Sequence, residues 1–268
     1  MDLPPLRLPR LGLRKVMMNK RLYVEGVGKR FGSFSAIEGL DFSVDPGRVV
    51  GLVGPNGCGK TTTLRCVVGL LEPNAGRIEI DGEPVASRRA KAGLAYVPDY
   101  PAGLAELTVR EFLALVRTLY KAPASFDARA RALLNAFSLE SRHNTMLVAL
   151  SLGMRRIVSF VAALALLPPL LVADEATAAL DPEAVVVVRE ALLAVASNGT
   201  GVLLATQDLH FAERTCDEVI LLSAGRTIAA GSIEELFARY GAASLEQVFL
   251  TALGKGAGID LEQVFRAH

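Results

Sequence analysis

The sequence predicts an α/β fold in which a mostly parallel sheet follows an antiparallel β region and is interrupted by an all-helical insertion. Short β-type runs separated by Gly and Pro open the chain, amphipathic helices fill its middle, and strands alternate with helices after about residue 170. With 268 residues, 51% of them hydrophobic and 21% charged, the chain is long enough to bury one substantial core with a smaller attached lobe.

The expected strands of the first third differ in pattern. Residues 40–44 and 77–80 alternate in the period-2 manner, which indicates strands with one face buried, and 22–27 is a further strand of this group. Residues 49–53 are continuously apolar, as expected for a parallel strand buried on both faces, and 94–97 is a second short buried strand. A helix is expected from Gly59 to about Gly69.

The helical insertion is expected over about residues 100–167. Thr108 and Glu111 have the spacing of a capping box, and they precede an apolar stripe at helical spacing. Further helices are predicted at 128–138 and 152–166.

The alternation of strands and helices then resumes. Strands are predicted at 170–173, 202–205 and 219–222, with helices at 183–196 and 209–215 between them. From residue 232 to 268 we expect a helical tail, in which Leu-Glu-Gln-Val-Phe occurs at 245–249 and again at 261–265.

Charge and composition exclude several classes of function. The net charge is +1, which gives no electrostatic case for nucleic-acid binding, although residues 1–30 are +6 and the remainder is −5. Residues 1–19 are expected to be a flexible basic arm, with attachment to anionic lipid or to a partner as the alternative. The three cysteines lack the spacing of a disulfide framework or a zinc site. The longest apolar run, 160–173, is too short to cross a bilayer.

A phosphate-binding loop is predicted at residues 54–62. Gly54-Pro55-Asn56-Gly57-Cys58-Gly59-Lys60-Thr61 fits G-x-x-x-x-G-K-[ST] between a buried strand and a helix, and Thr62 follows. The glycines let the backbone approach the phosphates, Lys60 supplies a charge to the β and γ phosphates, and Thr61 supplies a hydroxyl to Mg²⁺. The loop therefore predicts a P-loop ATPase core with ATP and Mg²⁺ as cofactors.

Two acids follow an apolar strand farther along the chain. The tip of the strand at 170–173 is expected to bring Asp174 to Mg²⁺ and Glu175 toward the water that attacks the γ-phosphate. A solvated acidic turn is the alternative for an isolated pair of this kind, and the upstream phosphate loop favours the functional interpretation.

Several segments together resemble the motifs of one family. Residues 54–62 have that family's form of the phosphate loop, and 150–154 resemble its signature, with Ser151 and Gly153 kept and Leu152 and Met154 where Gly and Gln usually stand. Residues 180–182, which contain Asp181, resemble its D-loop, and Phe31 occupies the position of an aromatic ring that stacks on adenine. Over about residues 20–231, the chain resembles the ATPase subunits of ABC transporters.

The resemblance implies a function shared between subunits. Two such domains associate head to tail, so that Ser151, Gly153 and Met154 of one contact the ATP held by the phosphate loop of the other. The implied partners are a second ABC ATPase subunit and an integral-membrane permease, with this chain peripheral on the cytoplasmic face of the cell membrane. Lys60, Glu175 and Gln207 are the implied catalytic residues, and Thr61, Asp99 and Asp174 the implied metal ligands.

Two positions depart from the family's pattern. Asp99 stands in place of the lid glutamine, and its carboxylate remains a hard ligand for Mg²⁺ with a shorter reach. Gln207 stands in place of the switch histidine; it can donate an N–H to the γ-phosphate but cannot become cationic. Reduced hydrolysis is therefore expected.

Three functions remain open at this point. The first is an ATP-hydrolysing motor for a permease, with export favoured because the tail segment 244–250 is similar to that of drug, antibiotic and sodium exporters. The second is a nucleotide-binding clamp with weak or no hydrolysis beside a more active partner. The third, an ABC protein acting on ribosomes or DNA, is disfavoured because the sequence has neither a second ATPase domain nor long coiled-coil arms.

Overall fold

The computed structural model describes residues 20–99 and 106–254. The expected basic arm at 1–19 and the second Leu-Glu-Gln-Val-Phe copy at 261–265 lie outside the described residues. Within the described residues, no helix is long and apolar enough to cross a bilayer.

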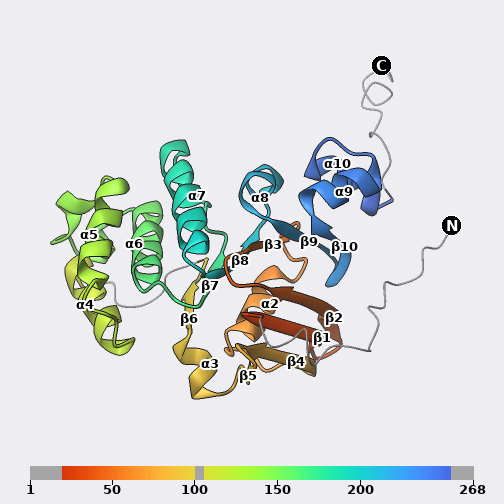
Figure 1. The fold of residues 1–268 in the computed structure, drawn as a ribbon, viewed down its shortest axis with the longest axis horizontal. Coiled ribbons are helices and arrows are strands. Elements are labelled where there is room, and N and C mark those ends of the chain that lie inside the picture. The colour runs from red at the N-terminus through yellow and green to blue at the C-terminus, as the bar shows by residue number, and fades with distance from the viewer. Residues whose placement is uncertain (1–19, 100–105, 255–268) are drawn as a thin grey trace.

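Two sheets form the centre of the molecule (Figure 1). The first is antiparallel, has the order β2-β1-β4-β5 and consists of β1 (Leu22–Phe31), β2 (Phe34–Val44), β4 (Ala75–Ile80) and β5 (Glu83–Pro84). The second has the order β10-β9-β3-β8-β7-β6, with β10 antiparallel to β9 and the other neighbours parallel. Its strands are β3 (Val49–Val53), β6 (Leu94–Val97), β7 (Leu170–Asp174), β8 (Gly201–Thr206), β9 (Glu218–Ser223) and β10 (Arg226–Ser232).

Helices cover both faces of the second sheet. Helix α2 (Lys60–Val67) packs between the two sheets, and α3 (Arg88–Ala92) precedes β6. The helical insertion comprises α4 (Val109–Leu119), α5 (Phe126–Ala136) and α6 (Leu152–Ala165), with short 3-10 turns at Glu140–Arg142 and Leu147–Ala149. The other helices are α7 (Pro182–Ser197), α8 (Leu209–Thr215), α9 (Ile233–Tyr240) and α10 (Leu245–Ala252).

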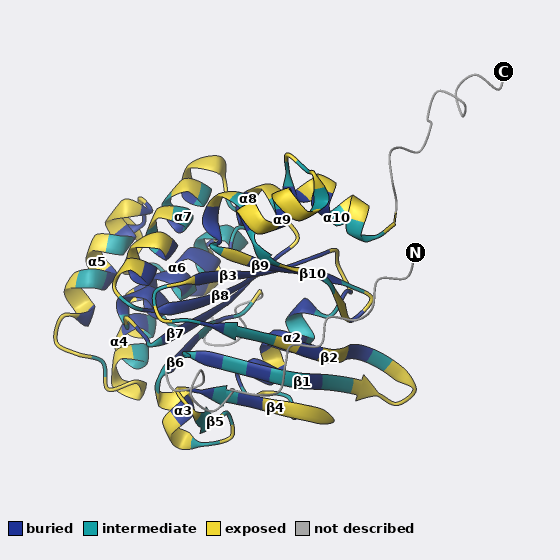
Figure 2. Ribbon diagram, turned by 45° about the vertical axis from the view of Figure 1, so that its right-hand side comes forward, coloured by how far each residue is buried: buried dark blue, intermediate teal, exposed yellow. Residues whose placement is uncertain are grey.

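Alternation along the buried strands divides the core into two clusters, one on each face of the second sheet. In β3, Val49 and Val53 pack with the cluster that includes α5, α6 and α7, whereas Val50 and Leu52 pack with the cluster that includes α2 and the antiparallel sheet. Strands β7 and β8 divide in the same way. Burial on both faces explains why these strands are continuously apolar (Figure 2).

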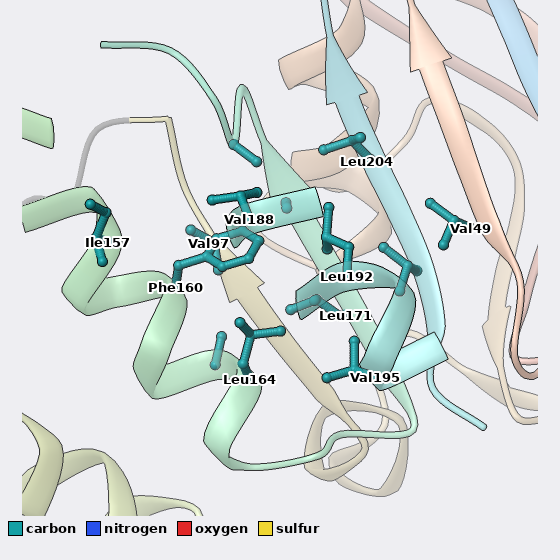
Figure 3. Packing of buried hydrophobic residues seen from close by; sticks show 14 of the residues in the cluster. Val49, Val97, Ile157, Phe160, Leu164, Leu171, Val188, Leu192, Val195 and Leu204 are labelled. Atoms are coloured by element: carbon teal, nitrogen blue, oxygen red, sulfur yellow. The ribbon is translucent and has the colours of Figure 1, made fainter. Parts of the chain in front are cut away.

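The core joins the helical insertion to the second sheet (Figure 3). Phe160 and Leu164 of α6 pack in one cluster with Leu171 of β7 and with Val188 and Leu192 of α7. Truncating a fully buried side chain such as Leu171 to Ala typically costs about 2–5 kcal/mol. Because α6 begins within the signature segment, this packing fixes the signature relative to the sheet.

The structure differs from the predicted strands at β1 of the antiparallel sheet and at β10 of the second sheet. Strand β1 continues to Phe31 rather than ending at Val27, with register shifts after Val24 and Val27 and with Gly26 at φ 59°. A glycine in this conformation allows a β-bulge, so the strand bends instead of ending. Strand β10, which the sequence analysis missed, is mostly half-buried or exposed and lies at the edge of its sheet.

Candidate functional site

The phosphate loop connects β3 to α2 through backbone that only glycine accommodates. Gly57 and Gly59 have φ values of 78° and 109°. A Cβ at Gly54 would lie 2.3 Å from the Leu222 carbonyl oxygen, and one at Gly59 would lie 2.7 Å from the Ala36 carbonyl oxygen. The glycines therefore serve the packing of the loop against its neighbours as well as its turn.

Lys60 lies over the loop that precedes it. Its Nζ donates to the carbonyl oxygens of Gly54 (2.8 Å) and Pro55 (3.2 Å), and its side chain is only 5% exposed. The same Nζ lies 3.3 Å from Glu175 Oε1, which makes an ion pair without hydrogen-bond geometry. A buried ammonium at the start of a helix provides a positive centre for an anionic ligand.

The other loop residues differ in exposure. Pro55, Asn56 and Gly57 are exposed, while Thr61 and Thr62 are half-buried in the first turn of α2. Cys58 is buried, and burial raises the pKa of its thiol. Cys58 is therefore a packed side chain and not an activated thiol.

Asp174 and Glu175 follow one another at the end of β7. Asp174 is fully buried, and neither carboxylate oxygen accepts a hydrogen bond of ordinary geometry from the described residues. Burial raises the pKa of this carboxyl, as do the charges of Asp99 and Glu175, while the nearby Thr61 hydroxyl and Lys60 act in the opposite direction. A buried carboxylate without a partner fits a site that a cation completes.

Glu175 is in a constrained conformation. Its φ is 47°, which is uncommon for a residue with a side chain, and its N–H donates to the Ala205 carbonyl oxygen at 2.8 Å. The backbone N–H of Gln207 lies 3.3 Å from Glu175 Oε2 and donates to it, while the Gln207 side chain is exposed. The structure thus brings Lys60, Asp174, Glu175 and the backbone of Gln207 together.

Asp99 is held by a residue that the sequence analysis did not single out. Arg156 Nη2 lies 2.5 Å from Asp99 Oδ1, and Arg156 Nε donates to the Asp99 carbonyl oxygen at 3.1 Å. The sequence did indicate that Arg156 is buried, because helical spacing places it on the same face as Phe160 and Ala163, which are buried. An arginine in such a stripe needs an acidic or carbonyl partner inside the protein.

The signature and D-loop residues lie together. Ser151 Oγ accepts from the Met154 N–H at 3.2 Å and caps α6, and Asp181 Oδ1 accepts from the Ala184 N–H at 2.8 Å and caps α7. A Cβ at Gly153 would lie 2.6 Å from the Ala179 carbonyl oxygen, so the start of α6 packs closely on the loop before Asp181. Both caps leave the start of a helix accessible at this surface.

Phe31 lies at the end of β1 and is 49% exposed. Its ring centroid is 5.5 Å from Lys29 Nζ, a distance that allows a cation–π contact. An exposed ring with a neighbouring cation is suited to stacking on a flat, electron-rich group such as a nucleobase.

The fold and these motifs define an ATP-binding cassette. The family model described as "ABC transporter" matches residues 37–178, which is more than half of the chain, and the chain belongs to this family. As a member of this transporter family, the chain is an ATP-binding subunit, and membership implies ATPase activity.

The individual relatives are exporter-type ATP-binding proteins. The chain is 39% identical over 218 residues to the Nod factor export ATP-binding protein I of Ralstonia nicotianae, covering 80% of this chain and 68% of the relative. It is 38% identical over 251 residues to the daunorubicin resistance ATP-binding protein DrrA3 of Streptomyces coeruleorubidus, covering 91% of this chain and 78% of the relative. A solved ATP-binding subunit of an ABC transporter superposes with a TM-score of 0.82 at 34% identity, covering 87% of this chain and 99% of that one. These similarities confirm the predicted family and fold class.

Proposed function

We propose that this chain hydrolyses Mg²⁺-bound ATP to power export by a separate integral-membrane permease, as a peripheral subunit on the cytoplasmic face of the membrane. The observation that carries the proposal is the convergence of buried Lys60, unpartnered Asp174 and Glu175 at the end of β7. A positive centre for phosphate thus lies beside an acid that can receive a proton from water. Export is favoured over import because the named relatives are exporter-type proteins.

The residues around Asp174 fit a nucleotide-bound magnesium ion. Among the described residues, no three His, Cys, Asp or Glu side chains converge to form a complete metal cage. Mg²⁺ is usually held by one or two carboxylates together with substrate phosphates, so Asp174 and the Thr61 hydroxyl would suffice as protein ligands, with Asp99 as a further one. The ion would neutralise charge on the β and γ phosphates.

In this proposal, the residues of this chain orient the attacking water and the nucleotide. Glu175 accepts the proton of the attacking water, and its backbone conformation and the Gln207 N–H fix its carboxylate. Lys60 holds the phosphates, and Phe31 stacks on the base. Ser151, Gly153 and Met154 would contact the nucleotide bound by a second ATPase subunit, which Asp181 would also face.

The experiment is affinity capture of the full-length chain from native membranes, followed by steady-state ATPase measurement with and without the captured membrane protein. We expect an integral membrane protein to co-purify and to stimulate hydrolysis. Capture without any integral membrane protein would remove the transporter function.

A second function, a nucleotide-binding clamp with weak hydrolysis, is favoured by Gln207. We expect Gln207→His to raise the ATPase rate of the assembled transporter by about tenfold, since a lost transition-state donor typically costs about 10²–10³ and Gln retains part of that contribution. The variant should also gain a pH dependence near the ordinary histidine pKa of about 6.5, with the higher rate below it, because only the protonated ring is cationic. An unchanged rate at every pH would show that position 207 does not limit hydrolysis.

A further inference from the structure

Arg156 is a buried cation that the chemistry described above does not use. It lies in the second turn of α6, and its side chain is only 5% exposed. Transferring a guanidinium out of water is unfavourable unless hydrogen bonds and an opposite charge compensate. The residues that Arg156 contacts therefore indicate which segments it holds in place.

The guanidinium uses all three of its nitrogens on two different loops. Nε and Nη2 donate to Asp99, the first to its carbonyl oxygen and the second to both its carbonyl and its carboxylate. Nη1 donates to the carbonyl oxygen of Ala178. One side chain thus joins the end of β6, the loop after β7 and the helix that begins at the signature.

The loop after β7 carries Glu175, the proposed general base, and Asp181. It begins at Glu175 and ends at Asp181, and both Glu175 and Ala179 have positive φ (47° and 61°). A non-glycine residue in this region persists only where its surroundings hold it. Arg156 on Ala178 and the close packing of Gly153 on Ala179 supply such restraint from α6.

Asp99 places a negative charge near the proposed metal site. Strands β6 and β7 are parallel neighbours in which Val97 pairs with Ala173, so Asp99 and Asp174 follow the same edge of the sheet. The negative charge of Asp99 also contributes to raising the pKa of Asp174. A carboxylate, unlike the neutral amide of glutamine, makes an ion pair with Arg156 and could at the same time supply an oxygen ligand to Mg²⁺. The carboxylate of Asp99 can therefore contact the metal and Arg156 at the same time, so that a change at the metal would alter the contact with Arg156.

We propose that Arg156 is a positioning residue that couples Asp99, and with it the Mg²⁺ of bound ATP, to the signature helix and to the loop that carries Glu175. A displacement of Asp99 toward the ion would be passed through Arg156 to α6 and to Ala178, so the signature and Glu175 would respond together. The inference rests on the proposed ATP site, and it assigns to Arg156 no direct contact with nucleotide.

The test is a double-mutant cycle with Asp99→Asn, Arg156→Gln and the double variant in the full-length chain. The readout is affinity for a fluorescent ATP analogue, measured with Mg²⁺ and with EDTA. We expect Arg156→Gln to weaken binding about tenfold with Mg²⁺ and less than twofold with EDTA, and the double variant to be no weaker than Asp99→Asn. Additive losses, or equal losses with and without Mg²⁺, would overturn the coupling.

Arg129→Gln is the matched control. Arg129 is a second arginine that donates to a backbone carbonyl, from Nε to the Ala165 oxygen at the end of α6 at 2.8 Å, and within the described residues it has no acidic hydrogen-bond partner. It should loosen the helical insertion without changing the Mg²⁺ dependence. If Arg156→Gln does not fold, Arg156→Lys keeps the charge with a single nitrogen and should lose part of the same Mg²⁺ dependence.

Hydrogen exchange of the ligand-free protein separates this inference from the proposed function. Arg156→Gln should speed amide exchange at 176–181 by tenfold or more, whereas Arg129→Gln should leave that segment unchanged. Similar exchange in both variants would contradict the restraint on the loop. Absence of ATP binding by the unaltered chain would remove the proposed function and the coupling to Mg²⁺, and the exchange result would still decide whether Arg156 restrains the loop at 176–181.

Discussion

Asp174, the proposed magnesium ligand, destabilises the folded state of the ligand-free protein through a single side chain. Its carboxylate is fully buried without a hydrogen-bond partner among the described residues, and burial raises its pKa. Between the ordinary carboxyl value and the raised one, the folded protein binds more protons than the unfolded chain. The stability of the ligand-free protein therefore falls as pH rises through that window.

We expect Asp174→Asn to stabilise the ligand-free protein by about 1–3 kcal/mol near neutral pH, because the neutral amide is easier to bury than an unpartnered carboxylate. The pH dependence assigned to Asp174 should disappear as well. Thermal unfolding across pH 4–8, with and without Mg²⁺-ATP, checks this: the variant should also lose most of the stabilisation by ligand. A less stable ligand-free variant would contradict our account of this residue.

The sequence predicted the local structure of single residues where they belong to a motif of adjacent residues. Residues 54–59 form a glycine-rich loop after a buried strand and residues 60–62 begin helix α2, as the motif predicts, because the motif needs only local backbone geometry. The role of Asp99 as a metal ligand stays a prediction, and its ion pair with Arg156 was not foreseen. That contact joins residues 57 positions apart, which no local pattern reports.

At the scale of elements, periodicity predicted the buried strands well and the partly exposed strand β10 poorly. The bounds of β3 and β6 match the predicted ranges, since β3 is buried throughout and β6 is buried except at the half-buried Tyr96. Strand β10 has mixed exposure and Gly231 near its end, so its pattern resembles a loop, and its pairing with β9 decides its structure.

The contact between α6 and the loop before α7 gives a prediction at this scale. Gly153→Ala places a Cβ 2.6 Å from the Ala179 carbonyl oxygen, so one of the two elements must move. Overpacking of this kind typically costs about 1–3 kcal/mol. We expect the ATPase rate of the assembled transporter to fall at least tenfold, while nucleotide affinity of the isolated chain stays within about twofold.

Gly93→Ala is the control for that substitution. A Cβ there meets Pro169 atoms at 3.5 Å, an ordinary contact, and Gly93 is not in the left-handed region. It should change neither rate nor affinity appreciably. A similar loss of rate in both variants would indicate general sensitivity of the fold and not a specific contact of the signature helix.

For the whole molecule, the sequence and the structure together establish the family and the architecture. The assembly with a permease and a second ATPase subunit is a proposal. The matched family and the exporter-type relatives make the chain an ATP-binding subunit of an exporter-type transporter. The permease and the second ATPase subunit, whose signature would complete each ATP site, belong to the proposal. Cargo could not be predicted from this sequence, because in the proposed assembly the separate permease would bind it.

Substitution of Glu175 tests the central claim that this site hydrolyses the ATP that drives transport. In Glu175→Gln, Lys60 keeps its hydrogen bonds to Gly54 and Pro55, so ATP binding should persist. Loss of a general base typically lowers the rate by about 10²–10⁴. The decisive measurement is the steady-state ATPase rate of the purified transporter assembled with this variant, beside its ATP affinity. Our account predicts retained affinity with hydrolysis reduced at least a hundredfold, and an unchanged rate would contradict it.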